Sequence, residues 1–175
     1  MLRRSCQTGG IDDLERRIRD AGSSLADLRE PLIAGEPWPL SERWGTEPEA
    51  DWGPREVLAH VSEMLPYWTD QLQGVIAGDS ATAVPFGRIA SDPSRLARID
   101  VERQQPVGEI LDAIAAGLDE AAAFAAGPAT EHADRLGLHS TRGEITIRAS
   151  VERFFVTHLE EHVEQLRSIL TRRPA

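Results

Sequence analysis

Apolar residues recur in steps of three and four along four stretches of the chain, the spacing that places them on one face of an α-helix. The first stretch begins at Ile11, and Pro31 is expected to end it. Gly53 and Thr146 are suited to the N-cap positions of the second and fourth stretches. The pattern predicts helices near 11–30, 53–77, 107–126 and 146–171.

Prolines and glycines separate these stretches and predict long connections between the helices. The connection from Gly78 to Pro106 carries a run of charged residues and is expected to be a functional lid or a disordered loop, with room for a short helix at 95–98. Only 145–147 is a candidate for a short strand. The sequence therefore predicts an all-α four-helix bundle with long inter-helix connections, one domain at 11–175 behind a flexible N-terminal segment at 1–10.

Composition and charge narrow the possible partners. The 175 residues suit one domain, and 29 Asp and Glu against 19 Lys and Arg give a net charge of −10. This charge repels phosphate backbones and anionic lipids, so neither nucleic acid nor a membrane is expected as a partner. With no spanning apolar run and no signal-peptide pattern at the start, the expected location is cytoplasmic. The single cysteine, Cys6, excludes an internal disulfide and a cysteine-based metal cage.

Histidines supply the candidate chemistry. His158 and His162 are one turn apart on the apolar face of the fourth helix, and His60 lies on the inner face of the second. Three inward imidazoles from two helices would form a facial ligand set with open coordination positions. The alternative is that His60 is a hydrogen-bonded core residue and the other two form a partly exposed surface pair. His132 and His139 lie in the connection before the fourth helix and are expected to be solvated.

Two segments resemble a known family. Residues 52–60 read W-G-P-R-E-V-L-A-H, with Tyr67-Trp68 following, and this resembles the W-S-x-x-E-V-x-x-H helix start of the DinB/YfiT-like metalloenzyme superfamily. Gly53 replaces the usual Ser. Residues 143–148, G-E-I-T-I-R, lead into H-x-x-x-H-x-x-Q at 158–165, which resembles the last helix of that family.

The resemblance covers nearly the whole chain and implies a four-helix bundle, often dimeric, with one divalent metal ion on a histidine triad. On this sequence the matching positions are His60, His158 and His162. Zinc or nickel is the expected ion, since imidazole suits both. A homodimer is expected from the family and from the alanine-rich stretch at 113–126.

Characterised relatives imply a metal-dependent enzyme that uses a low-molecular-weight thiol, such as bacillithiol, mycothiol or glutathione, as an S-transferase or isomerase on a small-molecule substrate. A coordinated thiol loses its proton and becomes a nucleophile at neutral pH. The same three ligands would serve a metal-dependent hydrolase, and a non-catalytic, stress-associated metal-binding protein is the third alternative.

Other polar and aromatic residues near the triad are secondary candidates. Glu63, one turn past His60, is a candidate general base or a hydrogen-bond acceptor for a metal ligand, or else a solvent-facing carboxylate. Gln165 is a candidate to orient a metal ligand, or else a polar flank. Arg88, Arg95 and Arg98 in the long connection are candidates to meet an anionic substrate or a thiol carboxylate, or else form a solvated charged face. The candidates for substrate binding are Tyr67, Trp68, Arg88 and Gln165. The two aromatic residues would line the pocket, or else belong to the core.

Overall fold

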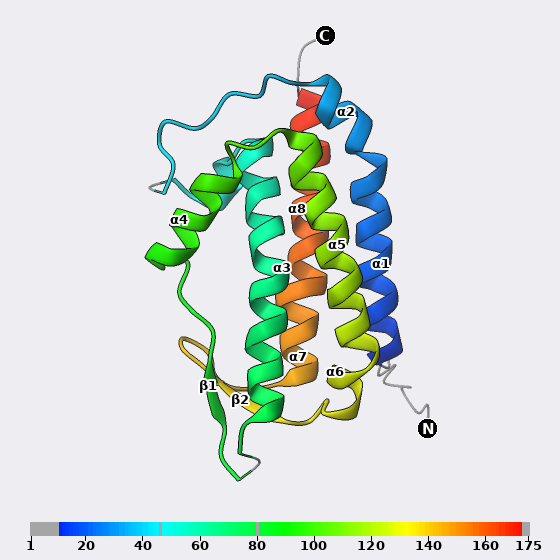
Figure 1. Cartoon of the computed structure of the whole chain (residues 1–175), viewed down its shortest axis with the longest axis vertical. Helices are drawn as coiled ribbons and strands as arrows, with labels where there is room; N and C mark the ends of the chain where they lie inside the picture. Colours follow the sequence, from blue (N-terminus) through cyan, green and yellow to red (C-terminus); the bar gives the residue numbers. More distant parts are fainter. Residues whose placement is uncertain (1–10, 46, 80, 173–175) are drawn as a thin grey trace, which may run out of the picture.

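The computed structural model describes residues 11–45, 47–79 and 81–172, and these are mostly helical with a small sheet at one end (Figure 1). Long helices lie side by side along the main axis of the molecule. They are α1 (Ile11–Asp27), α3 (Pro54–Ala77), α5 (Val107–Ala126) and a final stretch made of α7 (Ile147–Val151), η2 (Glu152–Thr157) and α8 (His158–Arg172).

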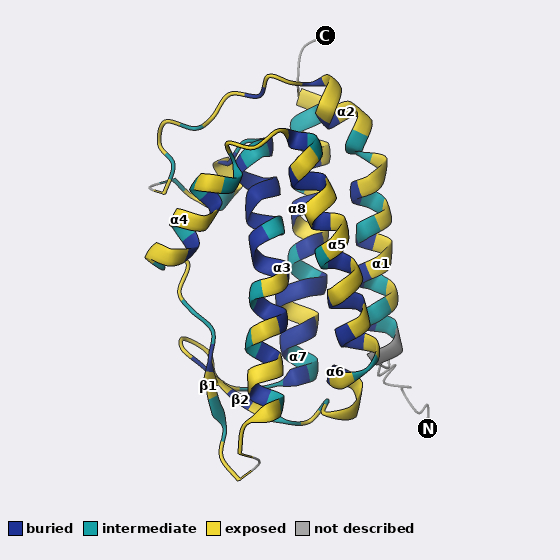
Figure 2. Ribbon diagram, in the orientation of Figure 1, coloured by how far each residue is buried: buried dark blue, intermediate teal, exposed yellow. Residues whose placement is uncertain are grey.

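The core lies where the apolar faces of these helices meet, as the dark inner faces in Figure 2 show. The helix α3 packs against α5, α5 packs against α1, and both α1 and α3 contact α8. Ile18, Met64 and Leu166 are fully buried in this core. Close approach of α3 and α5 depends on Gly117, because a Cβ atom there would lie 3.1 Å from the Cβ of Leu65. The sequence pattern thus identified the buried faces correctly.

The first helix differs from its prediction, because Pro31 does not end it. A second helix, α2 (Arg29–Ala34), continues past the proline, and the interruption falls at Leu28. Proline has no N–H to donate to the carbonyl four residues earlier, which is that of Asp27, so regular hydrogen bonding stops at Asp27 and resumes with Leu32 N–H donating to Leu28 O at 3.0 Å.

The other predicted helices are confirmed within a residue or two, with one change inside the last. Gly53 and Thr146 are the N-caps of α3 and α7, and the Thr146 hydroxyl accepts from Ala149 N–H. The segment η2 is π-helical, which widens the turn. Phe154, Phe155 and Val156 within this segment are all buried.

The connection from Gly78 to Pro106 is ordered, and the expectation that the chain has no clear strand is wrong. It contains β1 (Val84–Phe86) and α4 (Pro93–Glu102), which includes the predicted short helix. The strand β1 pairs in parallel with β2 (Leu136–His139), which pairs antiparallel with β3 (Gly143–Thr146). The candidate strand at 145–147 overlaps β3 at its last two residues. The strands β1 and β2 have three or four residues and contain proline or glycine, so their local pattern was too weak to predict them.

Short elements complete the described chain: η1 (Glu49–Asp51) lies in the connection before α3, and α6 (Pro128–Glu131) follows α5. The predicted N-terminal segment 1–10, with Cys6, lies outside the described residues. Across the described ranges, no helix is both long enough and apolar enough to span a lipid bilayer.

Candidate metal centre

Three histidines from two helices converge inside the molecule. His60 projects from α3, and His158 and His162 project from the first two turns of α8. The Nε2 atoms of His60 and His158 are 3.2 Å apart. The ring of His162 is centred 5.1 Å from that of His60 and 4.6 Å from that of His158. The structure therefore brings together the predicted triad, and the alternative of a surface pair fails because His162 is buried.

A carboxylate that the sequence did not single out joins the histidines. Glu49 lies in η1, and one donor atom from each of Glu49, His60, His158 and His162 falls within a group in which no two are more than 4.8 Å apart. Its Oε2 is 3.9 Å from His158 Nε2. The cluster thus contains three imidazoles and one carboxylate, a donor set that suits a divalent transition metal.

Gln165 determines how His162 presents its ring. The Gln165 Nε2 donates to the backbone carbonyl of Glu49 at 2.8 Å, so its Oε1 faces His162 Nδ1 at 3.0 Å. Because Oε1 only accepts, the His162 proton is on Nδ1 and the Nε2 carries a lone pair. That Nε2 is buried and has no hydrogen-bond partner within the described chain. An unpartnered buried lone pair beside two other imidazoles and a carboxylate fits a metal ligand.

The environment keeps these imidazoles neutral, which is the form that binds metal. Burial is the largest cause in each case, because it disfavours the charged ring. It lowers the pKa of His60 well below its ordinary value, with the His158 and Arg95 charges acting in the same direction. Burial and then the charge of His162 lower the pKa of His158 to about 3. Burial also lowers the pKa of His162, although the Gln165 hydrogen bond opposes it.

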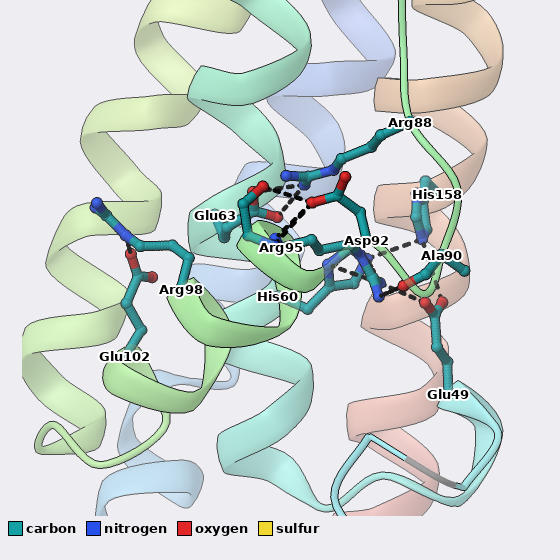
Figure 3. A network of polar contacts seen from close by, with 11 residues as sticks. Glu49, His60, Glu63, Arg88, Ala90, Asp92, Arg95, Arg98, Glu102 and His158 are labelled. Carbon is teal, nitrogen blue, oxygen red and sulfur yellow. Dashed lines mark hydrogen bonds and ion pairs between the residues drawn. The ribbon is translucent and has the colours of Figure 1, made fainter. Parts of the chain in front are cut away.

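Arg95 reaches the cluster from α4, as Figure 3 shows. It is almost completely buried, donates to Ala90 O at 2.9 Å and forms a short ion pair with Glu49. Its Nη2 is also 3.3 Å from His60 Nδ1. The cation of Arg95 and the anion of Glu49 compensate each other, so the guanidinium positions the carboxylate beside the histidines without adding net charge to the site.

The other predicted residues form a second group next to the cluster. Glu63 is buried rather than solvent-facing, and both of its oxygens accept from Arg88 at 2.5 Å. The Arg88 guanidinium carbon is 3.6 Å from the centre of the Tyr67 ring. Glu63 is not among the converging donor groups, so its structural role is to position Arg88. Arg98 is separate from the site and pairs with Glu102 at the surface.

A pocket of about 460 Å³ opens onto His60 and His158. One side of it is aromatic: Trp68 and Phe154 are stacked with their centres 4.1 Å apart and their planes 9° from parallel. His139 stacks on Phe154 at 5.2 Å and is buried, so the expectation that it is solvated is wrong. The pairing of β2 with both other strands causes this burial, and local sequence carried no sign of it. His132 is exposed, as expected.

A second pocket, of about 580 Å³, is lined in part by His158, His162 and Gln165. The two pockets share Glu49, His158 and Glu161, and the site is therefore open to small molecules. No protein-family model matches the sequence, and comparisons with curated proteins and with solved structures gave no match. The functional argument consequently depends on this geometry.

Proposed function

We propose that the cluster binds one divalent transition-metal ion, zinc or nickel, through His60, His158 and His162 with Glu49 beside them. One observation carries this proposal: four donor groups from three separate elements converge, and the His162 Nε2 among them is buried with a free lone pair. Imidazole binds both zinc and nickel well, and a neutral triad requires no proton to leave before metal enters.

We further propose that the chain is a DinB-like four-helix-bundle metalloenzyme that acts with a low-molecular-weight thiol, as an S-transferase or isomerase. The positions of His60 on α3 and of His158 and His162 on α8 support this, because they correspond to the second and last helices of the resemblance. A divalent ion at the site would supply one chemical property, a lowered pKa for a thiol that reaches it.

The residues of the chain would then select and hold the substrate. The pocket of about 460 Å³ gives a small molecule access to His60 and His158. The stacked Trp68 and Phe154 exclude water from one side of that pocket. The ion pair between Arg95 and Glu49 fixes the carboxylate that faces the histidines. Thiols remain reduced in the cytoplasm, which is the proposed compartment.

The first test is elemental analysis of protein purified without a His-tag or chelator. About one equivalent of zinc or nickel is expected. Less than about a tenth of an equivalent of any transition metal, with no uptake of added cobalt, would refute the metal site.

The second test separates the possible activities. Glutathione, bacillithiol and mycothiol are added in turn to the cobalt-substituted protein, and at least one should produce a sulfur-to-metal charge-transfer band. Turnover of esters or amides without any thiol response would instead identify a hydrolase. If neither assay responds, the protein is a non-catalytic metal binder.

We also propose a homodimer. The alanines of α5 support it, since Ala113, Ala116 and Ala123 are exposed and small enough for another helix to approach closely. Light scattering at micromolar concentration should give twice the 19.2 kDa chain mass. A mass of one chain would refute this.

A further inference from the structure

The pocket of about 460 Å³ beside the cluster is lined mainly by cationic side chains, in contrast to the acidic molecule as a whole. The chain as a whole carries a net charge of −10, yet this pocket is lined by four arginines and two glutamates. The arginines are Arg88, Arg95, Arg142 and Arg153. An excess of cationic side chains in a concave site of an acidic protein favours an anionic ligand.

Two of the four arginines are already neutralised. Arg88 is paired with Glu63, and Arg95 is paired with Glu49. In contrast, the guanidinium groups of Arg142 and Arg153 form no ion pair and no hydrogen bond with any residue that the structure describes. Each of these two groups therefore keeps all of its donors available to a ligand.

Arg142 and Arg153 come from different elements and approach the same pocket. Arg142 lies in the turn between β2 and β3, and Arg153 lies in η2 directly before Phe154. Their charges reach the interior: after burial, both act to lower the pKa of His139, and Arg153 also acts to lower that of His158. Two free cations thus flank an aromatic surface that ends at the histidine cluster.

The charge balance identifies the kind of anion. With Arg88 and Arg95 compensated, the pocket retains Arg142, Arg153 and the unpaired Glu161, which leaves one net positive charge. A single carboxylate neutralises this charge, whereas a phosphate dianion would leave the pocket with a net negative charge. Planar carboxylates also match the fork of a guanidinium.

We propose that Arg142 and Arg153 form a carboxylate-binding subsite, and that the small molecule acting at the histidine cluster carries a carboxylate. In combination with the proposed function, on which this part rests, the ligand is a carboxylate-bearing thiol or thioether. Its sulfur lies toward His60 and His158, its carboxylate lies between the two arginines, and its apolar part contacts Trp68 and Phe154.

The experiment compares two thiols that differ in charge. Cobalt-loaded protein is titrated with 3-mercaptopropionate and with 2-mercaptoethanol, and the dissociation constant is read from the cobalt absorption. The carboxylate should improve binding about tenfold, the effect of one charge-assisted hydrogen bond. In the double variant Arg142→Gln/Arg153→Gln the preference should fall below about threefold. Arg98→Gln, an arginine outside the pocket, should keep it. An unchanged preference in the double variant would overturn the subsite.

A second arm needs neither metal nor thiol. Metal-free protein is titrated with benzoate, benzamide and inorganic phosphate while the side-chain Nε–Hε NMR signals of Arg142 and Arg153 are followed. Saturable shifts with benzoate and none with benzamide are expected. Absence of a benzoate response, or tighter binding of phosphate than of benzoate, would refute the carboxylate subsite. A benzoate response in a protein whose cobalt form ignores every thiol would refute the proposed function and leave the subsite standing.

Discussion

His162 and His139 are both buried, and the Nε2 atom of each has no hydrogen-bond partner within the described residues. Their other ring nitrogens differ. The His162 Nδ1 faces an acceptor, the Gln165 Oε1, and so carries the proton. The His139 Nδ1 accepts from the backbone N–H of Thr141 at 3.2 Å, so its proton is on Nε2. The free nitrogen is therefore a lone pair in one histidine and a donor in the other.

The surroundings differ in the same sense. Around His162 lie two imidazoles and the Glu49 carboxylate, all of which offer lone pairs. Around His139 lie the rings of Phe86, Phe154 and Trp68, which offer none. Burial of a histidine is thus a poor sign of metal binding. The tautomer and the convergence of other donors are what distinguish a ligand from a packing residue.

Removal of each histidine in turn tests most directly whether His162 binds metal and His139 does not. His162→Ala should lower the affinity for zinc or cobalt by more than about 100-fold, since loss of a ligand exceeds the 10- to 100-fold cost of losing its supporting partners. His139→Gln should change the affinity by less than about twofold. Competition with a chromophoric chelator measures both, and circular dichroism checks that the helices persist. Equal losses in the two variants would mean that the tautomer argument is wrong.

Glu49 tests whether the carboxylate belongs to the donor set. Glu49→Gln removes the charge while keeping the size of the side chain, and the metal affinity should fall about 10-fold or more. The matched control is Glu42→Gln, an exposed glutamate of the same connection that should have no effect. If both variants bind metal like the original protein, the histidines act without the carboxylate.

Much of this site was predictable, because the fourth helix repeats every three to four residues and carries His158 and His162 on its buried face. His60 followed from the same rule on α3. Both histidines come after the π-helical segment, so its wider turn does not change the spacing between them. The same periodicity predicted the long helices within a few residues, except at Pro31, where the chain resumed a helix after a break.

The rest of the site depends on long-range contacts that no local pattern encodes. Glu49 is one of several glutamates in a proline-rich connection. Its place is fixed by the hydrogen bond between its carbonyl and Gln165 and by the ion pair between its carboxylate and Arg95. Arg95 was a candidate for an anionic substrate, but burial of α4 against α3 places it beside His60 instead. His139 was expected in solvent, but it is buried by strand pairing between segments about 50 residues apart, which no local pattern indicates.

Substitution of Gln165 tests the His162 tautomer without removing a metal ligand. Gln165→Leu removes the acceptor for His162 Nδ1, and the metal affinity should fall about 10-fold. Gln165→Glu restores an acceptor at the same position and should recover most of the loss, although the bond to the Glu49 carbonyl is not restored. Equal affinities for the Leu and Glu variants would show that the contact matters only for packing.

Stability in acid should depend in the same direction on His158, inside the cluster, and on His139, outside it. The folded protein holds the pKa of His158 at about 3, mainly by burial, against about 6.5 in an unfolded chain. Below pH 6.5 the unfolded state therefore binds more protons, and the stabilising effect of the neutral ring is lost as the pH falls from 6.5 toward 3. Between pH 7.5 and 5.5 this one histidine should lower the free energy of unfolding by about 1.4 kcal/mol.

Urea unfolding of metal-free protein at pH 7.5 and 5.5 measures that loss. His158→Gln should reduce the difference between the two pH values by about 1 kcal/mol. His139→Gln should reduce it in the same direction, because burial lowers the pKa of His139 as well. His158 and His139 would then respond alike to acid, although only His158 belongs to the proposed metal site. If the pH difference is unchanged in His158→Gln, His158 has the same pKa in the folded protein as in the unfolded chain. The cluster would then not be held in the neutral form that binds a metal ion.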